Sequence, residues 1–278
     1  MESELIHELP IRRFYYSMSY LLHISHIYDD DFPSDLIANL YCLVDNYYLE
    51  SLSILRSSKK KDESVKKEIE SKLKESRKRL AELEEERKQM SEDEREFADY
   101  QQASHVSTRE EHFRQTELEV EMSCLAAIVM MLSLLESTLF HLARELIEFD
   151  SNLPKMHDVM SRKDNGIVKY LKYFERCIEK QDKQFIVGTQ KYDLLMFWLK
   201  IRNNIVHNNN IISNEILEGA KRLNIDISTN RMTNKFRFKH EDIMALGNLC
   251  GSILDDCIEK GLYCYFSVDE IVGVDQSE

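Results

Sequence analysis

The fold is decided by Met122-Ser-Cys-Leu-Ala-Ala-Ile-Val-Met-Met-Leu-Ser-Leu-Leu135, the most apolar run in the chain. This run lies inside a longer stretch, between Pro33 and Pro154, that contains neither Gly nor Pro. Such a stretch predicts long helices, and it excludes an all-β fold, which needs frequent Gly and Pro turns. This run of 14 residues is too short to span a bilayer, so it predicts a core helix.

The composition narrows the class of protein further. With 43% hydrophobic residues among 278, the chain can build a real core, so wholesale disorder is excluded. All seven Gly lie at or after Gly166, and none forms the phosphate-binding loop of a Rossmann or P-loop enzyme. A net charge of -13 argues against binding of nucleic acid by the surface as a whole, but it does not exclude binding by a local basic patch. We expect an all-α protein.

The six Cys and the N-terminal residues indicate the cellular compartment of the protein. No Cys-x-x-Cys occurs, so a zinc finger is not indicated, and apolar surroundings favour buried free thiols in a reducing cytosol. Cys250, Cys257 and Cys264 recur every seven residues, as core positions on one helix edge do. The first ten residues are acidic and lack the apolar region of a signal peptide. We expect a cytoplasmic protein with no membrane partner.

Residues 1–54 predict an N-terminal helical segment. Two helices are expected over 11–56, separated by Pro33, with Ser34 as the N-cap of the second. His23, His26 and the acidic run 29–31 allow a metal site, but a helix that ends in a solvated acidic cap is the better interpretation. We therefore expect no bound metal.

Residues 55–117 predict a charged helical arm. Of the 43 residues in 55–97, 27 are charged, 14 of them basic and 13 acidic. Six acid-to-base pairs at i,i+4 support an exposed helix, namely Asp62/Lys66, Glu63/Lys67, Glu68/Lys72, Glu70/Lys74, Glu75/Arg79 and Glu84/Lys88. The apolar seam is thin, so the arm is either solvated or a contact for a partner or a second copy.

Two capping boxes follow the arm's first helix, one at Ser91 and Glu94 and one at Ser107 and Glu110. We expect a turn near 98–107, with the second box opening a helix that runs from about 108 to 150 back into the core.

Residues 118–265 predict a four-to-five-helix bundle. Its helices are expected over 118–150, 164–180, 189–207 and 240–261, and the tail 266–278 is acidic. The stretch 224–239 is the most strand-like in the chain and predicts a short β-hairpin.

The residues that can carry chemistry stand at the end of the 189–207 helix. An apolar stripe, Leu194, Trp198, Ile201 and Ile205, buries one face, and the sequence continues as Arg202-Asn-Asn-Ile-Val-His207. Three Asn follow and are good helix terminators, so His207 belongs to the last turn, where a helix C-terminus favours positive charge. Five residues correspond to about 500° of rotation, which separates Arg202 from His207 by about 140° around the helix.

This motif and the helix order resemble the HEPN superfamily of helical ribonucleases. The resemblance covers roughly 118–262 and leaves the first 117 residues unexplained. One HEPN subgroup carries a Tyr two residues after the His, where this chain has Asn209.

The resemblance implies metal-independent endonucleolytic cleavage of RNA, with tRNA as one candidate, by a toxin or anti-phage defence effector. His207 would exchange protons with the 2′-hydroxyl or the leaving oxygen, Arg202 would stabilise the phosphorane, and Asn203 would orient the His or a phosphate. No cofactor is implied. Pairing of two chains as a homodimer or a higher symmetric oligomer would bring a second His into one cleft.

A local basic patch around 200–240 supports RNA binding. It includes Lys200, Arg231, Lys235, Arg237 and Lys239, and the segment has a net charge of +5. Phe236 and Phe238 interleave with these cations and would either stack on bases or form the buried side of a hairpin.

Polar residues interrupt the apolar 118–150 helix. Glu136 is expected to be paired, with Arg202 as one candidate partner, and is a candidate polar residue of the cleft. Ser133, Ser137 and His141 follow at i, i+4 and i+8 and are candidates for the same lining. The alternative to a nuclease is a non-catalytic HEPN-like protein that dimerises through its bundle and binds a protein partner through 55–117.

Overall fold

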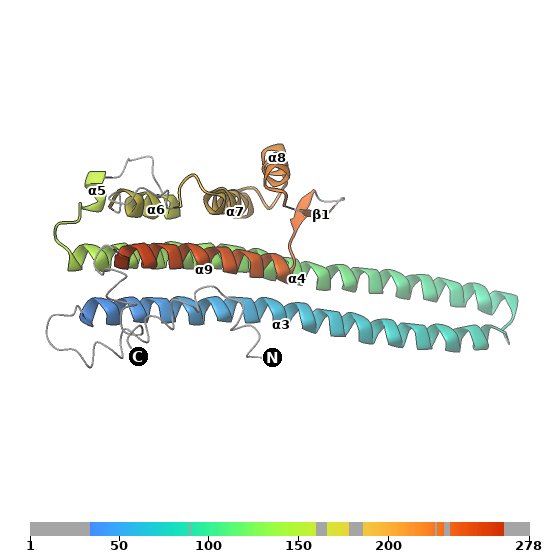
Figure 1. Ribbon diagram of the computed structural model, residues 1–278. Helices are drawn as coiled ribbons and strands as arrows, with labels where there is room; N and C mark the ends of the chain where they lie inside the picture. The colour runs from blue at the N-terminus through green and yellow to red at the C-terminus, as the bar shows by residue number, and fades with distance from the viewer. Residues whose placement is uncertain are drawn as a thin grey trace, which may run out of the picture.

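Figure 1 shows the chain as a computed structural model, which describes residues 34–88, 90–159, 166–177, 186–225, 227–230 and 234–263. Helices account for 85% of the described residues, with long paired helices and one two-stranded hairpin, as the sequence predicts. The expected helix before Pro33, the acidic cap with His23 and His26, Arg231, Cys264 and the tail 266–278 lie outside the described residues.

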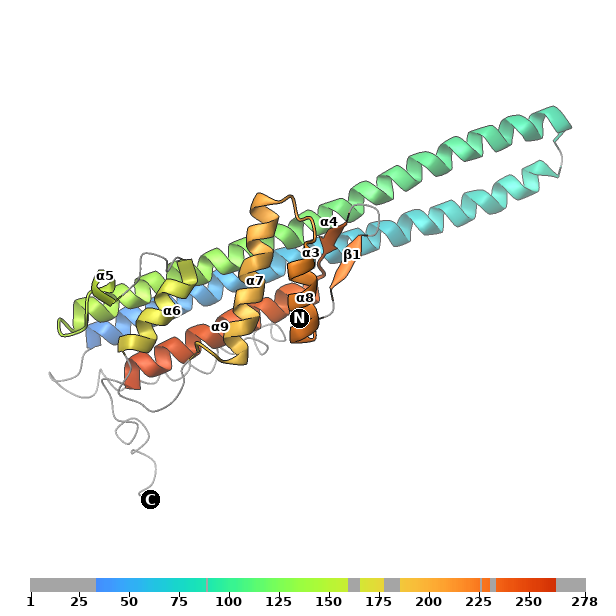
Figure 2. The same cartoon turned by 90° about the horizontal axis from the view of Figure 1, so that it is seen from above.

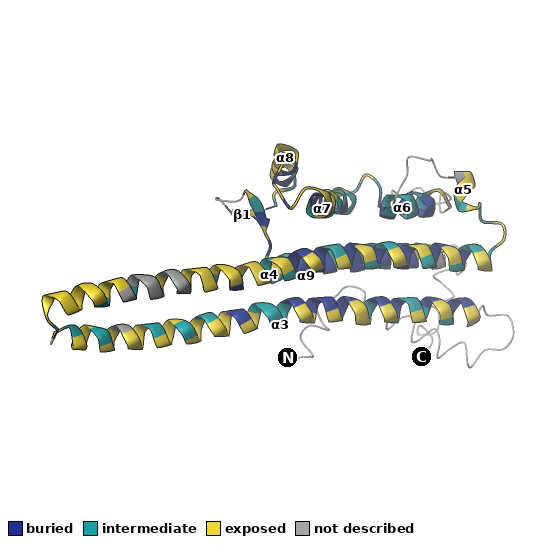
Figure 3. Cartoon of the chain, turned by 180° about the vertical axis from the view of Figure 1, so that it is seen from behind, coloured by how far each residue is buried: buried dark blue, intermediate teal, exposed yellow. Residues whose placement is uncertain are grey.

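Two very long helices form the backbone of the fold. Helix α3 covers Ser34–Arg87 and helix α4 covers Glu92–Phe149, so they contain 54 and 58 residues. They run antiparallel in contact with each other (Figure 1). Neither helix breaks where the predicted arm begins or ends. The change near 55 and 117 is therefore one of surroundings, from a packed core to solvent (Figure 3).

The turn between these helices lies earlier than the sequence suggested. The expected turn near 98–107 is wrong, because α4 begins at Glu92 and continues without a break through Ser107. The first capping box, and not the second, starts the helix. Both the backbone N–H and the hydroxyl of Ser91 donate to Glu94 Oε2, at 2.8 and 2.7 Å. With no Gly or Pro near Ser107, nothing in the chain stops the helix there.

The arm is helical and largely exposed, as expected (Figure 3). Of the six expected i,i+4 pairs, the structure forms Asp62–Lys66 at 2.5 Å and Glu68–Lys72 at 2.7 Å. Other ion pairs join the two arm helices instead, such as Lys61–Glu119 at 2.5 Å. Because the pairs are exposed, each adds only a few tenths of a kcal/mol.

The bundle is built in layers on this hairpin. Helix α9, His240–Tyr263, packs against both α3 and α4. Helix α6, Gly166–Cys177, and helix α7, Gln190–His207, lie across α4 and α9 on the side opposite α3 (Figures 1 and 2). Two short helices, α5 at Met156–Val159 and α8 at Asn214–Leu223, complete the upper layer.

The apolar run Met122–Leu135 forms the centre of the core. Ile128, Met131 and Leu135 are fully buried, and α4 touches α3, α6, α7 and α9. By length and composition alone Glu110–Phe149 could cross a membrane, with 39% of its most apolar 18-residue window buried in the protein. Its contacts on several sides favour the core helix that the sequence predicted.

Helix α8 was missed at the sequence level. Ser213 caps its start by accepting a bond from the Ile216 N–H at 3.4 Å, and Asn224 ends it in the left-handed conformation with φ 53°. Both residue types are ordinary signals for helix ends. The helix is only 10 residues long and lies between an Asn-rich segment and a strand-like one, so its apolar residues do not stand out as a helical repeat.

The predicted hairpin exists and buries its aromatic residues. Strand β1, Ser228–Asn230, pairs antiparallel with strand β2, Lys235–Arg237, with Thr229 opposite Phe236. Phe236 and Phe238 are buried, and the Phe238 ring lies 5.8 Å from that of Trp198. The interpretation that these rings stack on RNA bases is therefore wrong, because the rings belong to the core.

A polar contact joins three helices at the base of the arm. His240, the first residue of α9, approaches Ser58 of α3 with 3.5 Å between Nδ1 and Oγ. Ser58 Oγ in turn lies 3.9 Å from Cys124 Sγ of α4. Burial is the main cause that lowers the pKa of His240 below its ordinary value.

This pKa shift predicts a pH-dependent stability. Below pH of about 6.5 the unfolded chain binds a proton on His240 that the folded chain resists, so the free energy of unfolding should fall on acidification. In chemical denaturation between pH 7 and 5, His240→Asn should show a shallower fall than wild type. The exposed His157→Asn is the control and should keep the wild-type slope, and identical slopes for all three proteins would contradict the assignment.

Candidate functional site

The candidate site is the C-terminal turn of α7. The hydroxyl of Thr189 caps the helix start by accepting from the Tyr192 N–H at 3.4 Å. Leu195, Trp198 and Ile201 bury the side that faces the bundle. The helix therefore presents its last turn at the surface, with His207 as its final helical residue, as expected.

The three motif residues occupy two sides of that turn. Asn203 and His207 are exposed and share a face at i,i+4 spacing. Arg202 is half-buried, and its Nε is shielded from solvent and has no hydrogen-bond partner among the residues that the structure describes. The angular separation expected from the spacing is thus retained, and the motif does not form a closed constellation within one chain.

The Asn residues around the motif tie the helix end to the hairpin. The buried Asn204 donates from Nδ2 to the Ile211 carbonyl at 2.7 Å. The backbone carbonyl of Asn204 accepts from the backbone N–H groups of Asn208 and Asn210 at 2.9 and 3.3 Å. Asn210, also buried, donates from Nδ2 to the Phe236 carbonyl at 3.1 Å. The sequence pointed to helix terminators here, but not to this link.

Two of the predicted basic residues are engaged in ion pairs. Lys200 binds Glu215 at 2.5 Å, and the same contact lowers the pKa of Glu215. Arg237 binds Glu117 of the arm at 3.2 Å. Lys239 is exposed and Lys235 half-buried, whereas the structure does not describe Arg231. The patch therefore offers less free positive charge than its composition suggested.

Glu136 lies at the start of α6 and not beside Arg202. A Cβ at Gly166 would come within 3.5 Å of Glu136 Oε1, so the carboxylate sits against the N-terminus of that helix, where negative charge is stabilised. Burial, and then the charge of Glu136, raise the pKa of Tyr170. Within the described residues no ion pair joins Glu136 and Arg202, so the suggested pairing is wrong.

The other polar residues of α4 line a separate hollow. Ser133, Ser137 and His141 face a space of about 540 Å³ between α3 and α4, together with Tyr47 and Glu50. This hollow opens between the two long helices, whereas α7 crosses the opposite side of α4. The expectation that these residues share a cleft with the motif is therefore not met.

Thiols and metal ligands add no second site in the described part of the chain. Cys124, Cys250 and Cys257 are buried and Cys42 is exposed, and none of these four forms a disulfide within the described residues. Burial raises the pKa of Cys250 far above its ordinary value, which keeps the thiol protonated. Within the described residues, no three His, Cys, Asp or Glu side chains gather as a metal site would require.

Comparison with known proteins adds nothing to this geometry, since no protein-family model, no curated protein and no solved structure matches the chain.

The hydrogen bond from Asn210 to the Phe236 carbonyl yields a stability prediction, for which the neighbouring Asn209 is the control. Asn209 and Asn210 both have left-handed backbones, with φ 53° and 63°, but only the buried Asn210 makes the bond to Phe236. Asn210→Ala should lower the free energy of unfolding by about 1–3 kcal/mol more than Asn209→Ala, because it leaves a buried carbonyl unpaired. Denaturant melts of both variants measure this difference, and equal losses would show that backbone strain alone matters.

Proposed function

We propose that the protein is a cytoplasmic, metal-independent endoribonuclease of the HEPN type, acting with Arg202, Asn203 and His207. The observation that carries the proposal is the position of His207, exposed on the last turn of α7 with Asn203 on the same face. The order of α4, α6, α7 and α9, with the motif at the end of the third of these helices, supports the resemblance.

The chemistry requires little beyond these side chains. RNA supplies its own nucleophile, the 2′-hydroxyl, and an exposed imidazole can remove its proton or protonate the leaving 5′ oxygen. Arg202 is half-buried, and its Nε has no acceptor among the described residues, so its guanidinium would donate to a phosphate oxygen once the side chain turned toward the surface. Asn203, one turn before His207, is placed to orient the imidazole or a second phosphate oxygen.

One imidazole cannot serve as base and acid at the same time, so the proposal includes pairing of two chains. Two exposed apolar residues flank His207 in the chain, Val206 at 52% and Ile211 at 49% exposure. Apolar groups beside a polar centre are typical of a surface that a partner covers. In a two-fold pair the same patch meets itself, and each chain contributes one His to a common cleft.

The decisive test is RNA cleavage by purified protein in EDTA. His207→Ala and Arg202→Ala should each lower the cleavage rate by about 100-fold or more, as the loss of a general acid–base or charge-stabilising group does. The products should end in 2′,3′-cyclic phosphate or 3′-phosphate. His157→Ala removes an exposed His elsewhere and should cleave like wild type. An unchanged rate in His207→Ala, with an unchanged circular dichroism spectrum, would refute the assignment.

Shared use of two His residues predicts a dominant effect in mixtures. When excess His207→Ala chain is added to wild type, activity should fall as wild-type pairs become rare. Cleavage measured against the mixing ratio should follow the fraction of wild-type pairs. Activity proportional to the number of wild-type chains would instead point to independent monomers.

The second candidate is a non-catalytic protein that binds a partner through the arm. Its specific support is the exposure of aromatic side chains near the arm tip, with Phe97 64% and Tyr100 75% exposed. Wild-type protein that leaves total RNA intact would favour this candidate.

A further inference from the structure

Two surface hollows open along the α3/α4 hairpin. The tip hollow, of about 500 Å³, is lined by Arg79, Leu83, Glu86, Met90, Asp93, Glu94, Phe97, Ala98 and Gln102. The stem hollow, of about 710 Å³, is lined by Ser57, Lys61, Gln115, Leu118, Glu119, Met122 and Ser123. Both straddle the two helices, one at the end of the arm and the other at its base.

Helical spacing places both hollows on one side of the hairpin. Ser57 and Arg79 are 22 residues apart on α3, and so are Lys61 and Leu83. Twenty-two residues make about six turns plus 40°, so each pair points the same way at a separation of about 33 Å. Lys72 lies midway, 11 residues from both Lys61 and Leu83.

Each hollow leaves large apolar side chains uncovered. Phe97 protrudes at the tip, while Leu118 and Met122 at the stem are 54% and 57% exposed. Ser57 and Ser123 form part of the stem hollow, and their small side chains leave room for an incoming aromatic ring. The exposed aromatic side chain of the tip hollow can therefore pack against the apolar side chains of the stem hollow.

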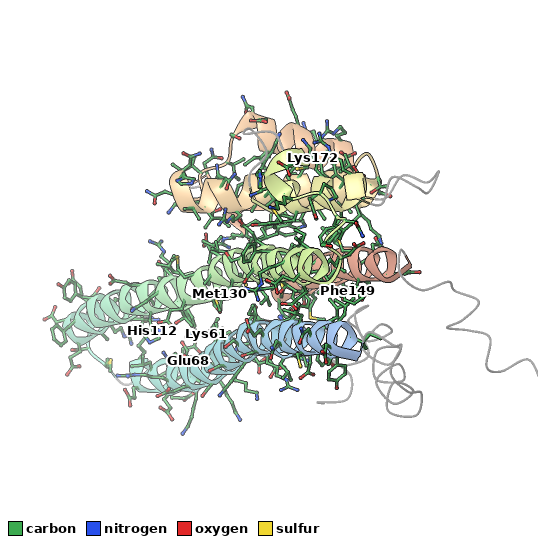
Figure 4. All side chains as sticks on the ribbon, turned by 90° about the vertical axis from the view of Figure 1, so that its left-hand side faces the viewer. Lys61, Glu68, His112, Met130, Phe149 and Lys172 are labelled. Atoms are coloured by element: carbon green, nitrogen blue, oxygen red, sulfur yellow. The ribbon has the colours of Figure 1, made fainter. Side chains whose placement is uncertain are left out.

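The charge of the arm differs between its two ends. Residues 82–99 at the tip contain nine acidic and three basic side chains, whereas the stem segments 56–74 of α3 and 107–123 of α4 together contain ten basic and nine acidic ones, with the basic excess on α3. Antiparallel arms therefore keep the two acidic tips apart. In the tip hollow, Glu86 and Asp93 have no cationic partner among the described residues. In the stem hollow, Lys61 lies beside Glu119, and Figure 4 shows Lys61, Glu68 and His112 between the ribbons of α3 and α4.

We propose that two copies of the chain pack their arms antiparallel, with the tip hollow of each covering the stem hollow of the other. The two-fold axis passes near Lys72 and His112, which are in contact at 2.6 Å between Nζ and Nε2. This arrangement inserts Phe97 of one copy beside Met122 of the other and brings Glu86 toward Lys61.

The surface available is large enough for a stable contact. From Ser57 to Met90 the face is about 50 Å long, and two helices side by side are about 20 Å wide. The resulting envelope of about 1,000 Å² per copy compares with about 800 Å² in a standard interface. The arms project beyond the rest of the bundle (Figure 2), which leaves space for a second arm alongside. The contact is separate from the His207 surface and independent of RNA cleavage.

Sedimentation velocity on the full chain tests the apolar part of this contact. Phe97→Ser should weaken self-association by about ten-fold or more, as loss of a central aromatic anchor does, and should halve the mass of the assembly at micromolar concentration. Tyr100→Ser is the matched control, because Tyr100 is an even more exposed aromatic residue of the same helix that does not line the tip hollow. Its dissociation constant should stay within about two-fold of wild type.

A charge exchange tests the antiparallel geometry. Glu86→Lys with Asp93→Lys makes the tip basic, and Ser57→Glu with Ser123→Glu makes the stem acidic. Each double variant alone should associate at least about ten-fold more weakly than wild type, because one pair of like charges is brought together in each contact. An equal mixture should regain association as heterodimers, since the basic tip of one chain then meets the acidic stem of the other. Circular dichroism controls for folding in every case.

Several results would overturn the proposal, and the first three come from the experiments above. They are a monomeric wild type at tens of micromolar, an assembly whose mass ignores all the arm variants, and a charge-exchange mixture that stays dissociated. An assembly that loses mass only when Val206→Glu is introduced would assign self-association to the end of α7 instead. Binding of a basic partner protein to the tip, without self-association, would likewise contradict antiparallel arms.

Discussion

The burial of one helix, α4, against neighbours on several sides is the constraint on which the rest of the structure depends. Its apolar half has Ile128, Leu132 and Leu135 in the interior, with α3 below and α9 beside it. Helices α6 and α7 can then lie across the top of α4 and α9, which fixes where α7 ends. His207 is the last residue of α7, so its position follows from how α7 packs on α4 and α9.

Much of this architecture was readable from the sequence, and the physical reasons are specific. The stretch without Gly or Pro and the run Met122–Leu135 predict long helices and identify the core helix, since both signals depend only on local chemistry. The end of α7 at His207 followed from an apolar stripe that is succeeded by Asn residues. The turn between α3 and α4 was misplaced because the sequence contains two capping-box patterns, at Ser91 and at Ser107. The pattern alone does not show which of the two starts a helix and which lies inside one.

The positions of the candidate residues on their helix were predictable from the sequence, but their surroundings were not. The exposure of His207 and the separation of Arg202 from it follow from helical periodicity. The role of Asn210 does not, because its partner is the Phe236 carbonyl 26 positions away, and only the folded chain brings the two together. The ion pairs of Lys200 and Arg237 were hidden for the same reason, and they reduce the positive charge left free for a polyanion.

The unbroken passage of α3 from the core into the arm has a mechanical consequence. About 29 residues, from Ser58 to its end, extend about 44 Å beyond the contact with His240, with no hinge between tip and bundle. A stiff rod of that length works as a lever, so a sideways displacement of the tip is delivered to the helices around Ser58 as a smaller movement with a larger force. Whatever holds the tip therefore pulls directly on the core, because no loop absorbs the strain.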